Sequence, residues 1–188
     1  MRQVGNGHQS ADAILDAIDQ RTEVGFPDHA SFMLYQENHD ETRYVVECGE
    51  PAALASAGAL FTLPGVPMLY GGQELGQLGR RDALAWEEAN DELREHYETL
   101  IDTRNEIPAL QFEGDFHRVD YESDSDRVTA FVRQDGGEGY VVALNFGGGR
   151  ASFSVAESVE TRDVVSGDDV LVDGELTVDD VVVLPIQG

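Results

Sequence analysis

Apolar residues in the first part of the chain recur in a pattern that predicts alternating helices and strands. Ala11, Ile14, Leu15 and Ile18 have the spacing of one helix face. Two short apolar runs bounded by turn residues predict buried strands, and the nearly all-apolar stretch between them predicts a helix buried on all sides. In chain order we expect a helix at 11–20 capped by Ser10, a strand at 31–35, a helix at 52–61 that opens at Pro51, a strand at 65–70 and an amphipathic helix at 86–104. This order is typical of β/α units with a parallel sheet.

The rest of the chain has a different pattern, in which strand-like runs follow one another without helical spacing between them. We expect strands at 116–121, 127–133, 139–146, 151–155, 161–165 and 181–186, some of them separated by Gly-rich turns. Short strands joined by tight turns predict a small antiparallel β-sandwich. The pattern therefore divides the chain into an α/β part, residues 1–112, and an all-β domain, residues 113–188.

The charge is strongly acidic throughout. The chain has 37 acidic against 12 basic residues, a net charge of −25, and every basic residue is an arginine. An acidic excess spread over the whole sequence would repel itself in dilute buffer and be screened at molar salt, where the Debye length is about 3 Å. We interpret this as adaptation to high salt. Such a surface excludes nucleic acid as a partner, since phosphates need basic residues.

Cysteine and hydropathy constrain the location of the protein. Cys48 is the only cysteine, so the chain can form no internal disulfide. No run approaches the roughly 20 apolar residues of a membrane span, and the first residues lack the apolar segment of a secretory signal. We expect a cytoplasmic protein with no membrane partner, and the alternative is secretion into a hypersaline medium.

Two polar motifs follow the two predicted strands of the α/β part. The first, Glu-Asn-His-Asp-Glu-Thr-Arg at 37–43, comes directly after the strand at 31–35. The second is the Gly-rich segment Gly-Val-Pro-Met-Leu-Tyr-Gly-Gly-Gln-Glu at 65–74. Ionisable residues at the ends of parallel strands are where β/α folds place catalytic groups. The alternative for each motif is an ordinary polar or Gly-rich turn.

Together the two motifs resemble late-barrel signatures of the α-amylase family of glycoside hydrolases. Residues 32–40 resemble the motif at the end of barrel strand 7, and residues 65–74 resemble that of strand 8. Residues 100–110 and 141–146 are similar to the end of the last barrel helix and to the β domain that follows it. The resemblance implies the last β/α units of a (β/α)₈ TIM barrel followed by a C-terminal antiparallel β-sandwich, with the boundary given above.

The resemblance also implies roles for individual residues. Asp40 would be the third carboxylate of the active site, a transition-state stabiliser that accepts hydrogen bonds from hydroxyls of the distorted sugar. His39 would bind the same sugar, an α-glucan or maltooligosaccharide. Asn38, Arg43 and Tyr70 would also contact the substrate, and the alternative role for Arg43 and Tyr70 is support of the loops. Gln73 and Glu74 would support these residues without touching the substrate.

The chain also departs from the family pattern. The family places its nucleophile and acid/base at the ends of strands 4 and 5, which would precede residue 11, so we expect the isolated chain to be inactive. Its expected partner is the missing N-terminal barrel portion, or a second copy. The alternatives to a fragment of a hydrolase are an inactive carbohydrate-binding or interaction module and a transglycosylase or isomerase of the same family. We expect no cofactor. Structural calcium belongs to the full-length family, but no acidic run here has the EF-hand spacing and no metal site is identified.

Overall fold

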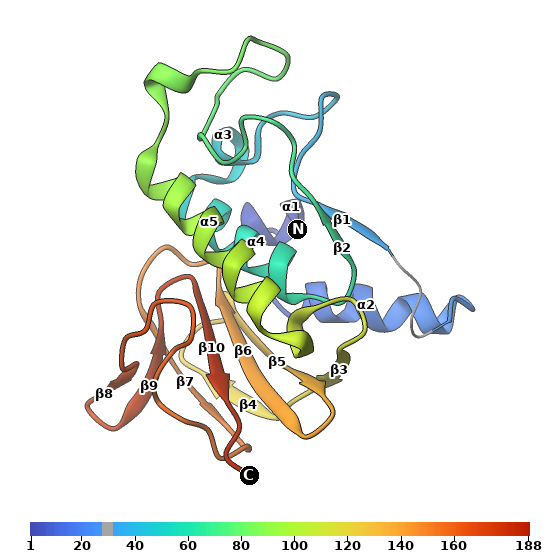
Figure 1. The fold of residues 1–188 in the computed structure, drawn as a ribbon, viewed down its shortest axis with the longest axis vertical. Helices are drawn as coiled ribbons and strands as arrows, with labels where there is room; N and C mark the ends of the chain where they lie inside the picture. Colours follow the sequence, from blue (N-terminus) through green and yellow to red (C-terminus); the bar gives the residue numbers. More distant parts are fainter. Residues whose placement is uncertain (28–31) are drawn as a thin grey trace.

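The computed structural model describes residues 1–27 and 32–188, so Ser31 of the first predicted strand lies outside the described residues. The helices and strands are α1 (Arg2–Gly5), α2 (Ala13–Glu23), β1 (Met33–Tyr35), α3 (Tyr44–Cys48), α4 (Glu50–Thr62), β2 (Val66–Met68), α5 (Asp91–Glu106), β3 (Asp115–Arg118), β4 (Tyr121–Ser123), β5 (Val128–Asp135), β6 (Glu138–Asn145), β7 (Ala151–Val155), β8 (Leu171–Val172), β9 (Glu175–Val178) and β10 (Val181–Pro185). Helix α4 packs against the β-rich half with α5 beside it, and α3 lies on the side of α4 away from the sheets (Figure 1). Among the described residues, no helix combines the length and the apolar character needed to span a bilayer.

Helix α4 lies at the centre of the molecule. Residues 55–62 are all buried, and the helix contacts α3 and α5 as well as β6 and β10. A Cβ atom on Gly58 would lie 2.7 Å from the Cβ atom of Val181, so this glycine allows the close approach of α4 to the sheet. The prediction of a helix buried on all sides, with Pro51 in its first turn, is confirmed.

Strands β3 to β10 form two four-stranded antiparallel sheets, in the orders β10-β6-β5-β3 and β4-β7-β9-β8. Val128, Phe153 and Leu184 belong to the core between the sheets. Phe131 and Val142 instead belong to the same core as α4. Antiparallel sheets agree with the predicted β-sandwich, and one of them also covers the central helix.

The predicted strand at 116–121 is wrong in its connectivity. Strand β3 pairs with β5, whereas β4 pairs with β7 in the other sheet. The chain therefore crosses between the sheets at Val119 and Asp120. An apolar pattern that continues through this crossing cannot reveal that its two ends belong to different layers.

The strand predicted at 161–165 is absent, and the buried carboxylate of Asp163 gives the reason. It accepts hydrogen bonds from the backbone N–H groups of Val165 and Ser166 at 3.2 and 2.9 Å. A side chain that binds the backbone just ahead of it stabilises a turn rather than an extended ladder.

Two helix starts also differ from the predictions. The helix predicted at 86–104 begins at Asp91, because the side chain of Asn90 accepts a hydrogen bond from the Leu93 N–H at 3.0 Å. Residues Trp86–Glu88 form a separate 3₁₀ turn. At α2, Asp12 rather than Ser10 stands at the N-cap position. Its carboxylate does not cap the helix but accepts hydrogen bonds from the side-chain hydroxyls of Tyr121 and Thr129 in the β domain.

The small parallel sheet of β1 and β2 is half-covered rather than buried. Leu34 packs against the core, but the alternate residues point to the opposite face, where Met33 is 61% and Val66 47% exposed. The prediction of buried strands is therefore wrong for this face. Within the described residues, the sheet has only these two strands, so nothing shields it there.

Two buried arginines hold the end of α4, from which β2 continues. Arg104 donates hydrogen bonds to the carbonyls of Phe61 and Gly65, each at 2.7 Å, and Arg133 donates to the Thr62 carbonyl. Burial lowers the pKa of Arg133 to about 9. Cations at a helix C-terminus are favoured by the helix dipole, so this pair fixes the point at which the chain enters β2.

Candidate active site

The two polar motifs leave the parallel sheet at the same edge. Strands β1 and β2 are direct parallel neighbours with Met33 opposite Val66, as the sequence predicts. Because parallel strands have their carboxyl ends at one edge, the segments at 36–42 and 69–82 extend from the sheet together (Figure 1). Each segment holds side chains that contact the other.

A buried ion pair lies at the base of these segments. The Arg43 guanidinium donates to one carboxylate oxygen of Glu37 at 2.6 Å, and both residues are almost fully buried. The second oxygen of Glu37 accepts from the N–H of Tyr44, also at 2.6 Å. The pair thereby closes the loop between β1 and α3 on itself.

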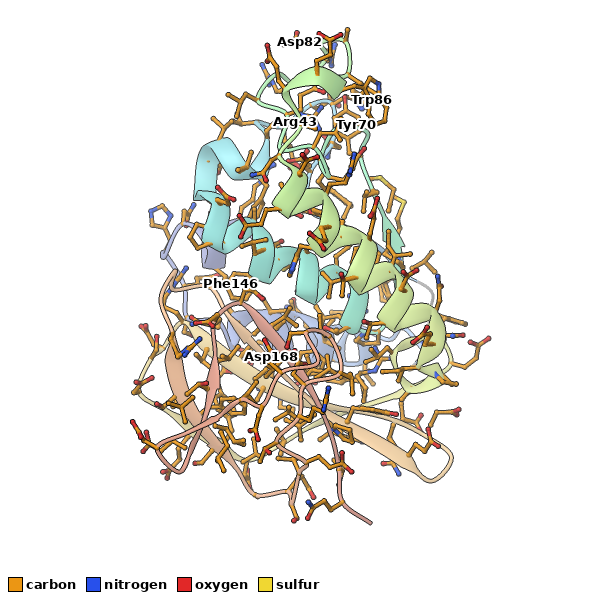
Figure 2. All side chains as sticks on the ribbon, turned by 60° about the vertical axis from the view of Figure 1, so that its left-hand side comes forward. Arg43, Tyr70, Asp82, Trp86, Phe146 and Asp168 are labelled. Atoms are coloured by element: carbon orange, nitrogen blue, oxygen red, sulfur yellow. The ribbon has the colours of Figure 1, made fainter. Side chains whose placement is uncertain are left out.

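Arg43 also holds the loop that follows β2. Its remaining donors reach the carbonyls of Gly79 at 2.8 Å and Gly71 at 3.0 Å, and its guanidinium lies 4.4 Å from the centre of the Tyr70 ring. Figure 2 shows Arg43 and Tyr70 together at this end of the molecule. The Tyr70 hydroxyl donates to the Arg80 carbonyl at 2.7 Å. The described contacts of Arg43 and Tyr70 thus support the loop.

Gln73 belongs to a second buried network behind the loops. Its amide N–H groups donate to the side-chain oxygen of Gln36 and to the hydroxyl of Tyr97, each at 2.8 Å, and Tyr97 donates to Gln36 at 2.7 Å. Burial raises the pKa of Tyr97, so the hydroxyl stays protonated as a donor. Glu74 has one buried carboxylate oxygen without a hydrogen-bond partner among the described residues.

Asp40 and His39 lie at the exposed end of the arrangement. The Asp40 side chain is 68% exposed, and one of its oxygens is 2.7 Å from a guanidinium nitrogen of Arg81. Its other oxygen is 3.3 Å from Nε2 of His39. The Asn38 side chain accepts from the Asp40 N–H at 2.9 Å, which fixes the turn that carries the carboxylate.

A hollow of about 520 Å³ opens beside these side chains. It is lined by His39, Asp40, Arg80, Arg81 and Asp82. Sequence reasoning singled out the first two but gave no role to the Arg80–Asp82 segment. Two adjacent arginines in a chain with only 12 basic residues were the available signal.

The chemistry available at this hollow is that of hydrogen-bond acceptance and donation. A carboxylate accepts from hydroxyl groups through two oxygens, while imidazole and guanidinium groups donate. Such a set suits a neutral, hydroxyl-rich ligand. Among residues 1–27 and 32–188, no group of three or more His, Cys, Asp or Glu side chains is arranged to hold a metal ion.

Comparison with known proteins relates the whole chain to α-amylases. The chain is 50% identical to an α-amylase, MalA, of Haloarcula japonica over 98% of its own length, but it spans only 29% of that relative. It superimposes with a TM-score of 0.81 on a maltogenic α-amylase from Thermotoga neapolitana, at 18% identity, covering all of this chain and 48% of the other. An α-amylase from Geobacillus thermoleovorans, solved with acarbose, matches with a TM-score of 0.76 at 21% identity and 46% coverage of that protein. No family model matches the chain.

Proposed function

Since the chain belongs to the α-amylase family of glycoside hydrolases, we propose that it is the C-terminal portion of a retaining hydrolase of α-glucans. Residues 1–112 then complete the catalytic barrel and residues 113–188 form its C-terminal β domain. The observation that carries the proposal is the position of Asp40 and His39 beside a hollow, at the C-terminal end of two parallel strands. The net charge of −25 fits an enzyme that works in high salt.

Asp40 is the proposed transition-state stabiliser. Retaining glycosidases pass through an oxocarbenium-like state in which the sugar ring is distorted, and hydrogen bonds to ring hydroxyls that strengthen there supply several kcal/mol. A carboxylate makes stronger hydrogen bonds than a neutral acceptor. Asp40 is exposed to the hollow, and the neighbouring His39 is the proposed donor to the same sugar.

The other predicted site residues support these two in our proposal. Asn38 holds the Asp40 backbone. Arg43 connects the two loops and Tyr70 holds the second of them, rather than reaching substrate. Gln73 joins the base of the loops to α5. The buried free oxygen of Glu74 would take its partner from the rest of the barrel.

The missing barrel portion is the proposed partner. Met33 and Tyr35 leave one face of the β1–β2 sheet exposed, and a two-stranded sheet has open edges that further strands can pair with. That portion would also bring the nucleophile and the acid/base, which must lie about 5–5.5 Å apart. The isolated chain then has a sugar-binding side chain but no groups to break the bond.

A chimera tests the proposed function directly. This chain replaces the matching segment of the Haloarcula japonica α-amylase, and starch hydrolysis is measured in molar salt beside the parent enzyme. We expect turnover comparable to that of the parent, because the chain supplies the same strand ends, and none from the chain alone. A chimera that unfolds cooperatively yet has no hydrolytic activity would refute the proposal. Transfer of glucosyl units without net hydrolysis would assign the chain to a transglycosylase or isomerase.

A further inference from the structure

We propose that Arg81 is the positioning residue of Asp40, a role that rests on the proposed function of Asp40. Arg81 comes from the loop after β2, whereas Asp40 comes from the loop after β1. The ion pair between them joins the two loops at the edge of the hollow. The positioning itself is a property of the folded chain and can be measured without any sugar.

One guanidinium group holds both the backbone and the side chain at this point. The Nε–H of Arg81 donates to the His39 carbonyl at 3.1 Å, and an Nη–H donates to the Asp40 carboxylate at 2.7 Å. Arg80 adds a hydrogen bond to the Asp40 carbonyl at 3.3 Å. The planar fork of an arginine spans two acceptors at once, which an ammonium group cannot do in the same geometry.

The loop that carries Arg81 is itself held by hydrogen bonds from Arg43 and Tyr70. Arg43, paired with buried Glu37, donates to the Gly79 carbonyl, and Tyr70 donates to the Arg80 carbonyl. The two residues just before Arg81, Gly79 and Arg80, are therefore held in place. Through its ion pair, Arg81 links the exposed Asp40 carboxylate to this fixed loop.

The contact orients the Asp40 carboxylate but leaves it able to accept further hydrogen bonds. Arg81 binds one carboxylate oxygen, while the other has, within residues 1–27 and 32–188, only the imidazole of His39 beside it, at 3.3 Å. Each carboxylate oxygen can accept more than one hydrogen bond, so sugar hydroxyls can bind while Arg81 stays in place. Arg81 and Asp40 are 67% and 68% exposed, and exposed pairs add little to stability. The role of Arg81 is therefore orientation rather than stabilisation of the fold.

Arg81→Gln in the full 188-residue chain tests the positioning by NMR relaxation in molar salt. We expect the order parameter of the Asp40 amide to fall from about 0.85 to below about 0.6, with an unchanged melting temperature. Arg81→Lys should give an intermediate value, because it keeps the ion pair but loses the bond to the His39 carbonyl. Arg94→Gln is the matched control, since Arg94 is also exposed and pairs with carboxylates, of Asp91 and Glu98, away from the hollow. An Asp40 amide that stays equally rigid in Arg81→Gln would overturn the proposal.

Turnover of the chimera separates this proposal from the proposed function. Arg81→Gln should lower kcat about tenfold to a hundredfold with little change in KM, as expected when a reacting group is misplaced, and Arg94→Gln should leave both unchanged. A loosened loop in a chimera without activity would leave the positioning intact and refute the function. An active chimera whose kcat is insensitive to Arg81→Gln would show that the positioning has no catalytic role.

Discussion

Replacing Asp40 by Asn in the chimera should lower turnover about a thousandfold. The carboxylate is proposed to form hydrogen bonds that tighten in the transition state and supply several kcal/mol, and each 1.36 kcal/mol corresponds to a tenfold change in rate. Asparagine has nearly the same shape but offers one neutral acceptor and a donor in place of two charged oxygens. Steady-state kinetics with a maltooligosaccharide in molar salt measures the effect.

The fold should tolerate this substitution. Asp40 is exposed and its ion pair with Arg81 is worth no more than about 1 kcal/mol, so thermal unfolding should be nearly unchanged. Asp179→Asn is the matched control, because Asp179 is also exposed and paired with an arginine, Arg150, at 2.7 Å, but lies in the β domain. Equal turnover in Asp40→Asn and Asp179→Asn would remove Asp40 from the active site.

Replacing Glu37 by Ala should lower the free energy of unfolding by about 3–5 kcal/mol. Glu37 pairs with the Arg43 guanidinium and accepts from the Tyr44 N–H, and all these groups are buried. Without the carboxylate, a buried charge and a buried donor lose their partner at once. Urea denaturation of the 188-residue chain at constant high salt gives the difference.

A double substitution distinguishes a lost ion pair from general damage at the same place. Glu37→Leu with Arg43→Met removes both charges and keeps the volume roughly constant, and such replacements are often close to neutral. We expect the double variant to be clearly more stable than Glu37→Ala alone. Its loop after β2 should still loosen, since the bonds of Arg43 to Gly71 and Gly79 are gone. A double variant as unstable as the single one would contradict the ion-pair explanation.

The parts of the fold that were predictable are those in which one local pattern determines one element. The nearly all-apolar helix α4 and the strands β5, β6, β7 and β10 fall within a few residues of their predicted ranges. The parallel pairing of β1 with β2 also follows from the order of elements. Strand β9 was missed because its apolar positions lie in an acidic stretch that resembles a solvated loop.

Long-range contacts explain what the sequence could not reveal about the site. The motif at 37–43 identified Asp40 as a candidate, but not that Arg81, 41 residues away along the chain, would hold it. Likewise the sequence left Arg43 open between a substrate contact and a support of the loops. Its burial and its bonds to Gly71 and Gly79 depend on the path of a second loop, which no local pattern specifies.

A crystal structure of the chimera with acarbose bound is the most direct test of the central claim, that the Asp40 carboxylate contacts the distorted sugar ring. We predict that the Asp40 oxygens accept hydrogen bonds from two ring hydroxyls, with Arg81 still bound to the carboxylate and the β1–β2 sheet covered by neighbouring strands. Acarbose seated in the barrel with Asp40 pointing into solvent, outside hydrogen-bond distance of the ring, would contradict the account.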